Sequence, residues 1–249
     1  FNKSLALHKN WQSYQGLGLA LFQTKQYQPA IEAFNKSLAL HEDGQSYKGL
    51  GLALGNTQQY QLAIEAFNKS LALHEDWQSY RGLGEALRYT KQAAEAIEAF
   101  NKSLALHEDW YSYHSLGLAL LDRKQSRESI DAFRKAIVLK ESISTYHNLG
   151  LALCNIKQYQ EAIDVFQKSL SLKKDWDSYY FLGLALAGAN QFYETITALG
   201  KSLLLIGTSS EDESIMQIAS VYPALAKALN EAGREDSAIR TWEKHYSHK

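Results

Sequence analysis

Two glycines in the segment YQGLGLAL (residues 14–21) could form a phosphate-binding turn, because closely spaced glycines let backbone amides approach an anion. Such a turn also requires a preceding strand and a longer glycine pattern, whereas this segment lies in a run of good helix formers. The second glycine returns every 33 residues as Gly18, Gly51, Gly84, Gly117, Gly150 and Gly183, and the first gives way to Ser115, Asn148 and Phe181. A glycine inside a helix costs roughly 1 kcal/mol relative to alanine. We therefore predict that the recurring glycine lets two helices pack closely and binds no phosphate.

Histidine side chains are a second group that could do chemistry, because they can bind metal ions. One recurring set comprises His8, His41, His74 and His107, and a second pair comprises His114 and His147. Neighbouring helical repeats place such residues about one helix diameter apart, ~10 Å, which is too far for zinc bonds of about 2 Å. His245 and His248 share a spacing of three residues but lack a third ligand. We predict no metal site, and we expect His114 and His147 to donate hydrogen bonds to a ligand.

Cys154 is the single cysteine and could act as a nucleophile. That role needs a base and an orienting group, and His147 lies two turns away on the same predicted helix. The sequence contains no HExxH motif, no nucleophile elbow and no paired carboxylates in a fixed loop. We predict no catalytic residue, no cofactor and no enzymatic activity.

The composition narrows the class of protein further. A formal net charge of −1 over 249 residues gives no basic surface for nucleic acid or an anionic membrane. No apolar run reaches membrane-spanning length, and a single cysteine gives no sign of an oxidising compartment. We expect a cytoplasmic protein, and the start at Phe1 in the middle of a repeat suggests a fragment of a longer one.

A repeat of 33 residues positions all of these side chains. The segment FNKSLALHKNW at residue 1 returns as FNKSLALHEDG at residue 34 and as FNKSLALHEDW at residues 67 and 100, with weaker copies at 133, 166 and 199. Each unit contains two apolar stripes with helical spacing, separated by a short polar turn. In the third unit the first stripe is Tyr80, Leu83, Gly84 and Leu87, and the second is Ala96, Ile97, Phe100, Leu104 and Leu106. We expect antiparallel helical hairpins that bury their apolar faces only by stacking.

Small residues in the second helix are predicted to lie opposite the recurring glycine. They are Ala30, Ala63, Ala96, Ser129 and Ala162.

The pattern of Tyr80, Leu83, Gly84, Ala96 and Phe100 resembles the tetratricopeptide repeat, and it occurs six times in phase. The resemblance implies an all-α fold, a right-handed α-solenoid of stacked antiparallel helical hairpins whose first helices line a concave groove. It predicts the second helix of a truncated repeat over 1–10, six repeats over 11–208, and an inserted segment with a degenerate repeat over 209–249.

Two departures from the family pattern concern the turn between repeats. These units are one residue shorter than the family's usual 34 residues, and the family's proline is replaced by Glu42, Glu75, Glu108, Glu141 and Lys174. We expect an altered turn and therefore leave the superhelical pitch open.

The resemblance also implies which residues face a ligand in the concave groove. They are Gln45, Lys48, Gln78, Arg81, Glu85, Arg88, Tyr111, His114, Leu118, His147, Leu151 and Tyr180. The carboxylate clamp of chaperone-binding relatives is not reproduced, because Leu52 follows Lys48 and Glu85 follows Arg81 at the clamp spacing.

These residues predict a protein-interaction scaffold that binds a partner peptide or helix. A basic patch of Lys48, Arg81 and Arg88 beside groove leucines favours a ligand with acidic and aliphatic residues, although the charges could serve solubility and the leucines could serve helix packing. Two alternatives stay open: an accessory docking domain of a larger enzyme such as a transferase, and a homo-oligomer formed through exposed solenoid ends.

Overall fold

The computed structural model describes residues 10–206, 221, 223–224, 226–228 and 231. Residues 1–9 of the helix predicted over 1–10, the inserted segment, and His8, His245 and His248 lie outside the described residues. So does most of the predicted degenerate repeat. Residue 10 caps α2 (Trp11–Gln23). The chain divides into two compact units, unit 1 (Phe1–Lys124) and unit 2 (Gln125–Lys249).

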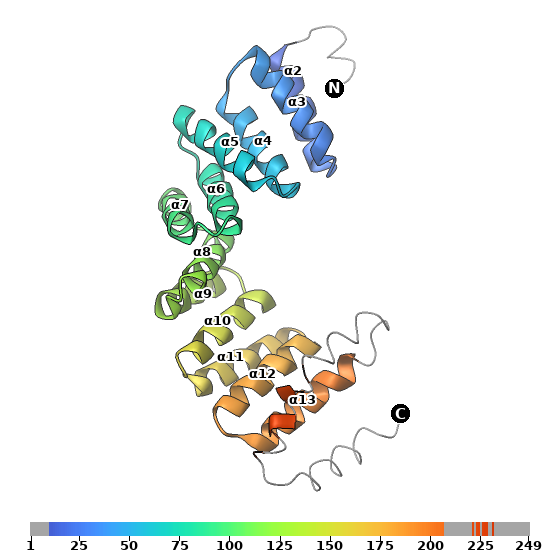
Figure 1. The fold of residues 1–249 in the computed structure, drawn as a ribbon, viewed down its shortest axis with the longest axis vertical. Helices are drawn as coiled ribbons and strands as arrows, with labels where there is room; N and C mark the ends of the chain where they lie inside the picture. The colour runs from blue at the N-terminus through green and yellow to red at the C-terminus, as the bar shows by residue number, and fades with distance from the viewer. Residues whose placement is uncertain (1–9, 207–220, 222, 225, 229–230, 232–249) are drawn as a thin grey trace. The chain divides into compact units, whose positions relative to one another are not determined.

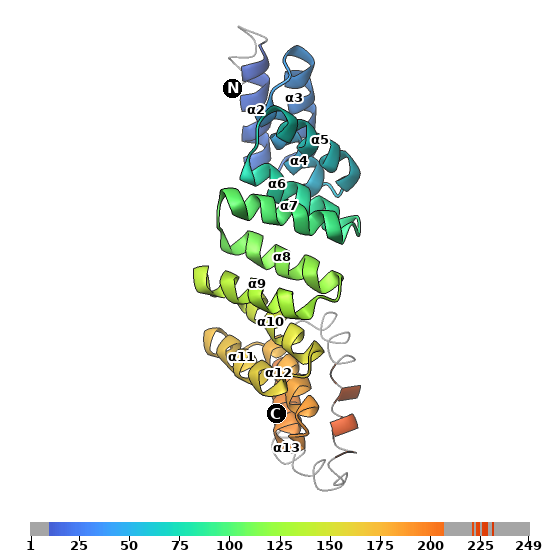
Figure 2. The same ribbon diagram turned by 90° about the vertical axis from the view of Figure 1, so that its left-hand side faces the viewer.

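The described helices alternate between first and second members of hairpins (Figures 1 and 2). The first helices are α2 (Trp11–Gln23), α4 (Gly44–Asn56), α6 (Trp77–Tyr89), α8 (Trp110–Asp122), α10 (Ile143–Asn155) and α12 (Trp176–Gly188). The second helices are α3 (Tyr27–Leu40), α5 (Tyr60–Leu73), α7 (Ala93–Leu106), α9 (Ser126–Leu139), α11 (Tyr159–Leu172) and α13 (Phe192–Ile206). Within each unit a second helix packs on the first helix of the next hairpin. The predicted all-α fold of stacked helical hairpins is confirmed.

Each hairpin turn reverses the chain through one residue with left-handed backbone. These residues recur at the repeat period, with φ between 58° and 62°: Lys25, Gln58, Lys91, Lys124, Lys157 and Asn190. In the third repeat the Lys91 amide donates to the Arg88 carbonyl (3.0 Å) and the Gln92 amide donates to the Leu87 carbonyl (2.9 Å). This pair of bonds is the Schellman motif, which satisfies the last carbonyls of α6.

Replacing Lys91 by glycine is expected to stabilise the protein by about 0.5–1 kcal/mol. A left-handed backbone crowds the lysine Cβ but leaves glycine unstrained. Ala105→Gly, at an exposed site within α7, is the matched control and is expected to cost about 1 kcal/mol. Urea unfolding monitored by circular dichroism measures both changes, and equal destabilisation by the two glycines would contradict the assignment of strain to residue 91.

Fully buried phenylalanines form the centre of the hairpins. Phe34, Phe67 and Phe100 are each 0–2% exposed. A Cβ added at Gly51 would lie 2.8 Å from the Phe67 ring, and one added at Gly84 would lie 2.7 Å from the Phe100 ring. The predicted packing role of the glycine is confirmed, and the atoms nearest to it belong to a phenylalanine ring. The glycine makes room for the ring four residues beyond the small residue.

The same ring also contacts the following hairpin. A side chain at Gly49 would collide with Phe34, and one at Gly82 would collide with Phe67. In unit 2 the equivalent position is Phe181, whose ring stacks on Phe166 with centroids 5.8 Å apart and planes 16° apart. The variable first glycine of the sequence pattern is therefore a position of contact between hairpins.

Serines on the second helices form a buried polar contact that was not predicted from the sequence. The Ser70 hydroxyl donates to the Gly44 carbonyl (2.8 Å) and lies 3.1 Å from the Ser79 hydroxyl of the next hairpin. Ala99 and Ser103 belong to the buried face of α7, whereas Leu106, predicted to lie on that face, is 51% exposed. The recurring triplet Lys-Ser-Leu was the available signal for this serine.

The turn between hairpins is held by a tyrosine and the glutamate that replaces the family's proline. The Tyr47 hydroxyl donates to Glu42 (2.9 Å), and the Tyr113 hydroxyl donates to Glu108 (2.6 Å). In unit 2 the Tyr146 hydroxyl donates to Glu141 (2.7 Å). The glutamate fixes the turn through a side-chain bond that proline could not make.

Tyr113 and Tyr146 are expected to ionise unusually late in a tyrosinate absorbance titration. The hydrogen bond to Glu108, followed by burial, raises the pKa of Tyr113 to about 12. Burial, followed by the bond to Glu141, raises the pKa of Tyr146 to about 12. Since both folded pKa values lie above the ordinary value of 10.0, their contribution to stability is complete below about pH 10 and is lost as the pH rises through 12. Glu108→Gln should lower the pKa of Tyr113, and an unchanged titration in that variant would contradict the assignment.

Candidate functional site

The first helices form the inner side of unit 1. Neighbouring first helices contact one another, α2 with α4, α4 with α6 and α6 with α8. The second helices α3, α5 and α7 make no such contacts among the described residues. This difference curves the stack toward its first helices. In unit 2, α10 and α12 contact each other in the same way.

The residues predicted to face the groove divide between the two units. Gln45 and Tyr111 are exposed, whereas the remaining members except His114 are half-buried: Lys48, Gln78, Arg81, Glu85, Arg88 and Leu118 in unit 1, and His147, Leu151 and Tyr180 in unit 2. His114 is only 9% exposed, and burial followed by the nearby Arg88 lowers its pKa. The His114 ring, predicted to donate to a ligand, therefore lies largely within the helix packing.

The predicted basic patch is neutralised within unit 1. The Lys48 ammonium lies 3.2 Å from Asp76 and donates to Gln78 (2.9 Å). The Arg81 guanidinium lies 3.8 Å from Asp109, the side chain that caps the next first helix. Each cation thus has a carboxylate partner in the following repeat, so this surface does not specifically favour an acidic ligand.

Arg88 is paired with two carboxylates. Its guanidinium lies 3.9 Å from Glu85 and 3.7 Å from Asp122, and it covers the Tyr89 ring at 4.9 Å. Its Nε atom is buried without a hydrogen-bond partner among the described residues. Three predicted groove cations are therefore surrounded by at least as many carboxylates.

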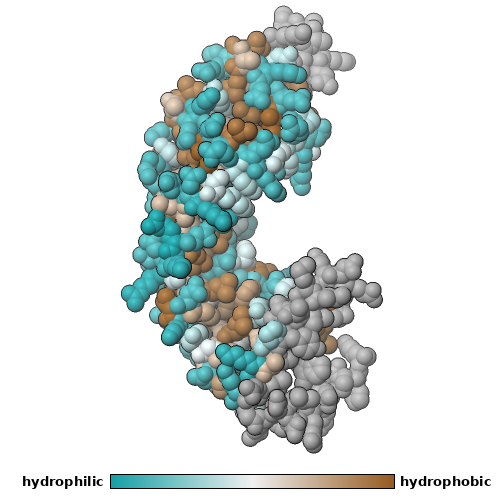
Figure 3. Space-filling model, viewed as in Figure 1, coloured by the Kyte–Doolittle hydropathy of each residue, from teal (hydrophilic) through white to brown (hydrophobic). Residues whose placement is uncertain are grey.

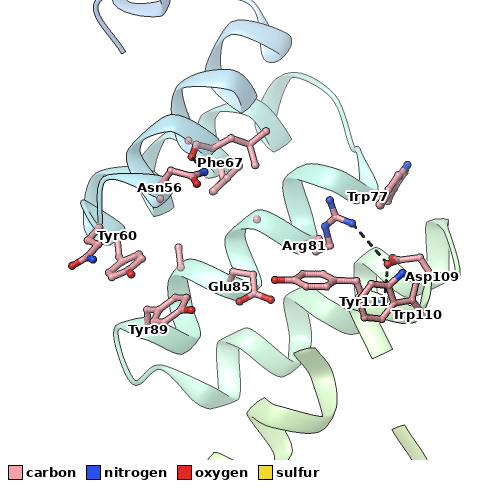
Figure 4. Close-up of a pocket in the computed structure, with 16 residues that line it drawn as sticks. Asn56, Tyr60, Phe67, Trp77, Arg81, Glu85, Tyr89, Asp109, Trp110 and Tyr111 are labelled. Atoms are coloured by element: carbon pink, nitrogen blue, oxygen red, sulfur yellow. Dashed lines mark hydrogen bonds and ion pairs between the residues drawn. The ribbon is translucent and has the colours of Figure 1, made fainter. Parts of the chain in front are cut away.

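An open pocket of about 790 Å³ lies on this inner side of unit 1 (Figure 4). Its walls come from α4, α5, α6 and the start of α8. They include Leu52, Gly55, Asn56, Tyr60, Phe67, Trp77, Arg81, Glu85, Tyr89, Asp109, Trp110 and Tyr111. Of the predicted groove residues, Arg81, Glu85 and Tyr111 meet here.

Aromatic rings form the two ends of the pocket. At one end Tyr60 and Tyr89 stack with centroids 4.6 Å apart and planes 9° apart. At the other end the Arg81 guanidinium covers the Trp77 ring at 4.9 Å and the Tyr111 ring at 5.4 Å. Figure 4 shows Tyr111 extending toward Glu85 between these ends. Burial, followed by Glu85, raises the pKa of Tyr111, so its hydroxyl remains a hydrogen-bond donor at neutral pH.

Three further residues line the pocket although the sequence did not predict them: Tyr60, Trp77 and Trp110. Tyr60 begins a second helix, and the implied groove set was taken from first helices alone. The tryptophans begin first helices one residue before the first implied positions, Gln78 and Tyr111. Their available signal was the recurrence of a large aromatic residue at the start of most repeats.

In unit 2 the predicted groove histidine is engaged by its own chain. The His147 Nε2 atom lies 2.8 Å from the Ser178 hydroxyl, and its ring lies 5.1 Å from the Phe181 ring. Burial raises the pKa of Cys154 to about 11, so its thiol is protonated and poorly nucleophilic at neutral pH.

The histidines at the ends of second helices contact aromatic rings. The His41 ring lies 4.7 Å from that of Trp11, and the His107 ring lies 4.5 Å from that of Trp77. Within the described part of the chain, no three His, Cys, Asp or Glu side chains are grouped as metal ligands.

The surface of the described helices is largely hydrophilic, with scattered apolar patches, in the view of Figure 3. None of the helices described in the structure combines the length and apolar character needed to cross a membrane.

Comparisons with known proteins agree with the hairpin architecture. Models of the tetratricopeptide repeat match residues 12–43, 48–113, 111–142 and 144–176. No curated protein matches the chain significantly.

Three solved structures illustrate the likeness of fold. MamA (residue 41 to the end) from Desulfovibrio magneticus RS-1 is 23% identical with a TM-score of 0.63, over 67% of this chain and 97% of that one. YrrB, described as a TPR protein with an unusual peptide-binding site, is 20% identical with a TM-score of 0.64, over 76% and 98%. The APC/C hetero-tetramer Cut9–Hcn1 is 21% identical with a TM-score of 0.67, over 92% of this chain and 44% of that one. At these identities the likeness shows the fold alone. The family models, the 33-residue period and the stacked hairpins together show that this chain belongs to the tetratricopeptide repeat family.

Proposed function

We propose that this chain is a protein-interaction scaffold that binds a segment of a partner protein on the inner side of unit 1. Membership of the tetratricopeptide repeat family supports a scaffold in general. The pocket between α4 and α8 supports a specific place for the contact, because it joins aromatic anchors with polar groups in a concave site.

The observation that carries the proposal is where two neighbouring repeats differ. Helices α4 and α6 have identical sequences except at Gly44/Trp77, Lys48/Arg81, Leu52/Glu85, Gly55/Arg88 and Asn56/Tyr89. Most of these residues line the pocket. The two repeats therefore share their packing residues and differ in the residues that a ligand would contact.

Relaxed constraint on exposed residues does not account for this pattern. The second helices α5 and α7 are identical from Ala63 and Ala96 to their ends, including exposed positions such as Glu65 and Glu98. Over this stretch the exposed positions of the outer helices are unchanged, whereas positions on the inner helices differ. Exposed positions of the outer helices differ only in their first turn, at Gln61/Ala94 and Leu62/Glu95. Recognition on the inner side explains this contrast.

A photo-cross-linking residue placed at position 89 tests the proposal. We expect it to capture a partner from source-cell lysate that the same residue at position 73, exposed on α5, does not capture. The double variant Arg81→Glu, Arg88→Glu should abolish that capture while retaining the helical circular dichroism of the parent. Equal capture from positions 73 and 89, or capture that survives the double variant, would contradict binding on the inner side.

A further inference from the structure

The pocket of unit 1 contains an arginine whose charge is balanced but whose hydrogen-bonding capacity is unused. The Arg81 side chain is 29% exposed and is held between the rings of Trp77 and Tyr111. No described residue accepts a hydrogen bond from its guanidinium. A planar guanidinium carries five N–H donors, so a fixed arginine of this kind can direct several donors at a ligand.

Asp109 balances the charge of Arg81 but accepts no hydrogen bond from its guanidinium, which lies 3.8 Å away. The Asp109 carboxylate already accepts hydrogen bonds from the Tyr111 amide (3.0 Å), the Ser112 amide (3.1 Å) and the Ser112 hydroxyl (2.5 Å). Those bonds cap α8 and hold the carboxylate 3.8 Å from the guanidinium. Asp109 therefore balances the charge of Arg81 and leaves the N–H donors of the guanidinium available to a ligand.

The equivalent cation one repeat earlier behaves differently. Lys48 donates to Gln78 (2.9 Å) and lies 3.2 Å from Asp76. Tyr111 replaces that glutamine in the following repeat, and the ring stacks on Arg81 instead of accepting a bond. The third repeat thus keeps a cation that its own neighbours do not saturate.

An acceptor lies beside this donor in the same wall. Glu85 is one helical turn from Arg81 on α6, also lines the pocket, and accepts a bond from Ser115. Asn56 donates its amide hydrogen to the Leu52 carbonyl (2.9 Å), which leaves the Asn56 side-chain oxygen as a further acceptor.

From this arrangement we infer that the pocket binds an uncharged amide-rich polypeptide segment, one with Asn or Gln side chains between aliphatic or aromatic residues. A ligand carboxylate would suit Arg81 but meet Glu85 and Asp109, and a ligand cation would suit Glu85 but meet Arg81. An amide carries an acceptor for Arg81 and a donor for Glu85 in one neutral group. The inference rests on the proposed function and replaces the acidic ligand expected from the sequence.

Three pools of short fluorescein-labelled peptides test the inference by fluorescence anisotropy. Their apolar positions are shared, and their polar positions hold Asn and Gln, Asp and Glu, or Lys and Arg. We expect the amide pool to bind about tenfold more tightly than either charged pool, since each charged pool faces one like charge in the pocket. Its affinity should change less than about twofold between about 0.05 M and 0.5 M salt, because no net charge is neutralised.

Matched variants test whether binding of the amide pool depends on the planar set of N–H donors of the Arg81 guanidinium, here called the fork. Arg81→Lys keeps the charge but loses the fork and should weaken binding of the amide pool by about tenfold. Lys48→Arg, the reverse change one repeat earlier, should leave the affinity unchanged. Tighter and salt-sensitive binding of the acidic or basic pool, or an amide-pool affinity that Arg81→Lys leaves unchanged, would overturn the inference. So would failure of all three pools to bind. A position-89 cross-link obtained alongside any of these results would leave the proposed function standing.

Discussion

Phe67→Ala is expected to destabilise unit 1 by about 3–5 kcal/mol, the largest effect of any single substitution considered for this chain. The Phe67 ring is 2% exposed and fills the space between Gly51 of its own hairpin and Gly82 of the next. Neither glycine has a side chain that could move into the vacated volume, so the cavity would persist. The substitution therefore loses both the transfer free energy of the ring and its contacts within and between hairpins.

Urea unfolding measured by tryptophan fluorescence and circular dichroism checks this expectation. Leu73→Ala, at a residue 53% exposed on the same helix, is the control and should cost well below 1 kcal/mol. Because repeats unfold in part independently, the Phe67 variant should also show a broader or two-step transition. A loss no larger than that of the Leu73 variant would show that the ring is not a central packing element.

Gly51→Ala and Gly55→Ala are expected to change stability in opposite directions, although both add one methyl group to α4. A Cβ at Gly51 would lie 2.8 Å from the Phe67 ring, which is fully packed and cannot withdraw. Overpacking of this kind costs about 1–3 kcal/mol, which exceeds the gain of about 1 kcal/mol from alanine's helix propensity. At Gly55 nothing lies within 4 Å of the added atom, so only that gain applies.

The pair separates steric fit from helix propensity in one helix. Thermal and urea unfolding should show loss of stability for Gly51→Ala and a gain of up to about 1 kcal/mol for Gly55→Ala. In the sixth repeat, Gly183 faces Leu199 instead of phenylalanine. A Cβ at Gly183 would lie 2.5 Å from the Leu199 side chain, so the glycine is required there as well. Two alanine variants of equal stability would contradict the steric account.

The hairpins were predictable because one physical pattern is repeated. Apolar residues at helical spacing returned in register, so the prediction from Tyr80 to Leu87 matched the buried side of α6 apart from the half-buried Tyr80. The prediction for α7 was less accurate because small and polar residues carry little hydrophobic signal. Ala99 and Ser103 are buried there through close helix contact and a hydrogen bond to the Trp77 carbonyl (2.9 Å).

The candidate site was only partly predictable, since charge pairing depends on distances between repeats. Lys48 and Asp76 are far apart in the sequence, and no local pattern shows that they meet. The burial of His114 could not be predicted for the same reason, because it results from the packing of neighbouring helices. The residue types were enough to predict an inner face on the first helices. The pairing of charges on that face could be seen only in the structure.

The contacts between repeats have a consequence for how the chain can change its length over evolution. The same residues join each hairpin to the next. Asp76 caps α6 and pairs with Lys48 of the preceding hairpin. Ser79 of α6 contacts Ser70 of that hairpin. Removal of residues 44–76 would place Trp77 directly after Asp43. Gln15 would keep its present partner Asp43, and Ser37 would meet Ser79 in place of Ser46. Unequal recombination between the near-identical segments would thus delete or duplicate whole hairpins and still restore the contacts at the new junction. The number of repeats, and with it the length of the binding surface, would change while the fold of each hairpin stays the same.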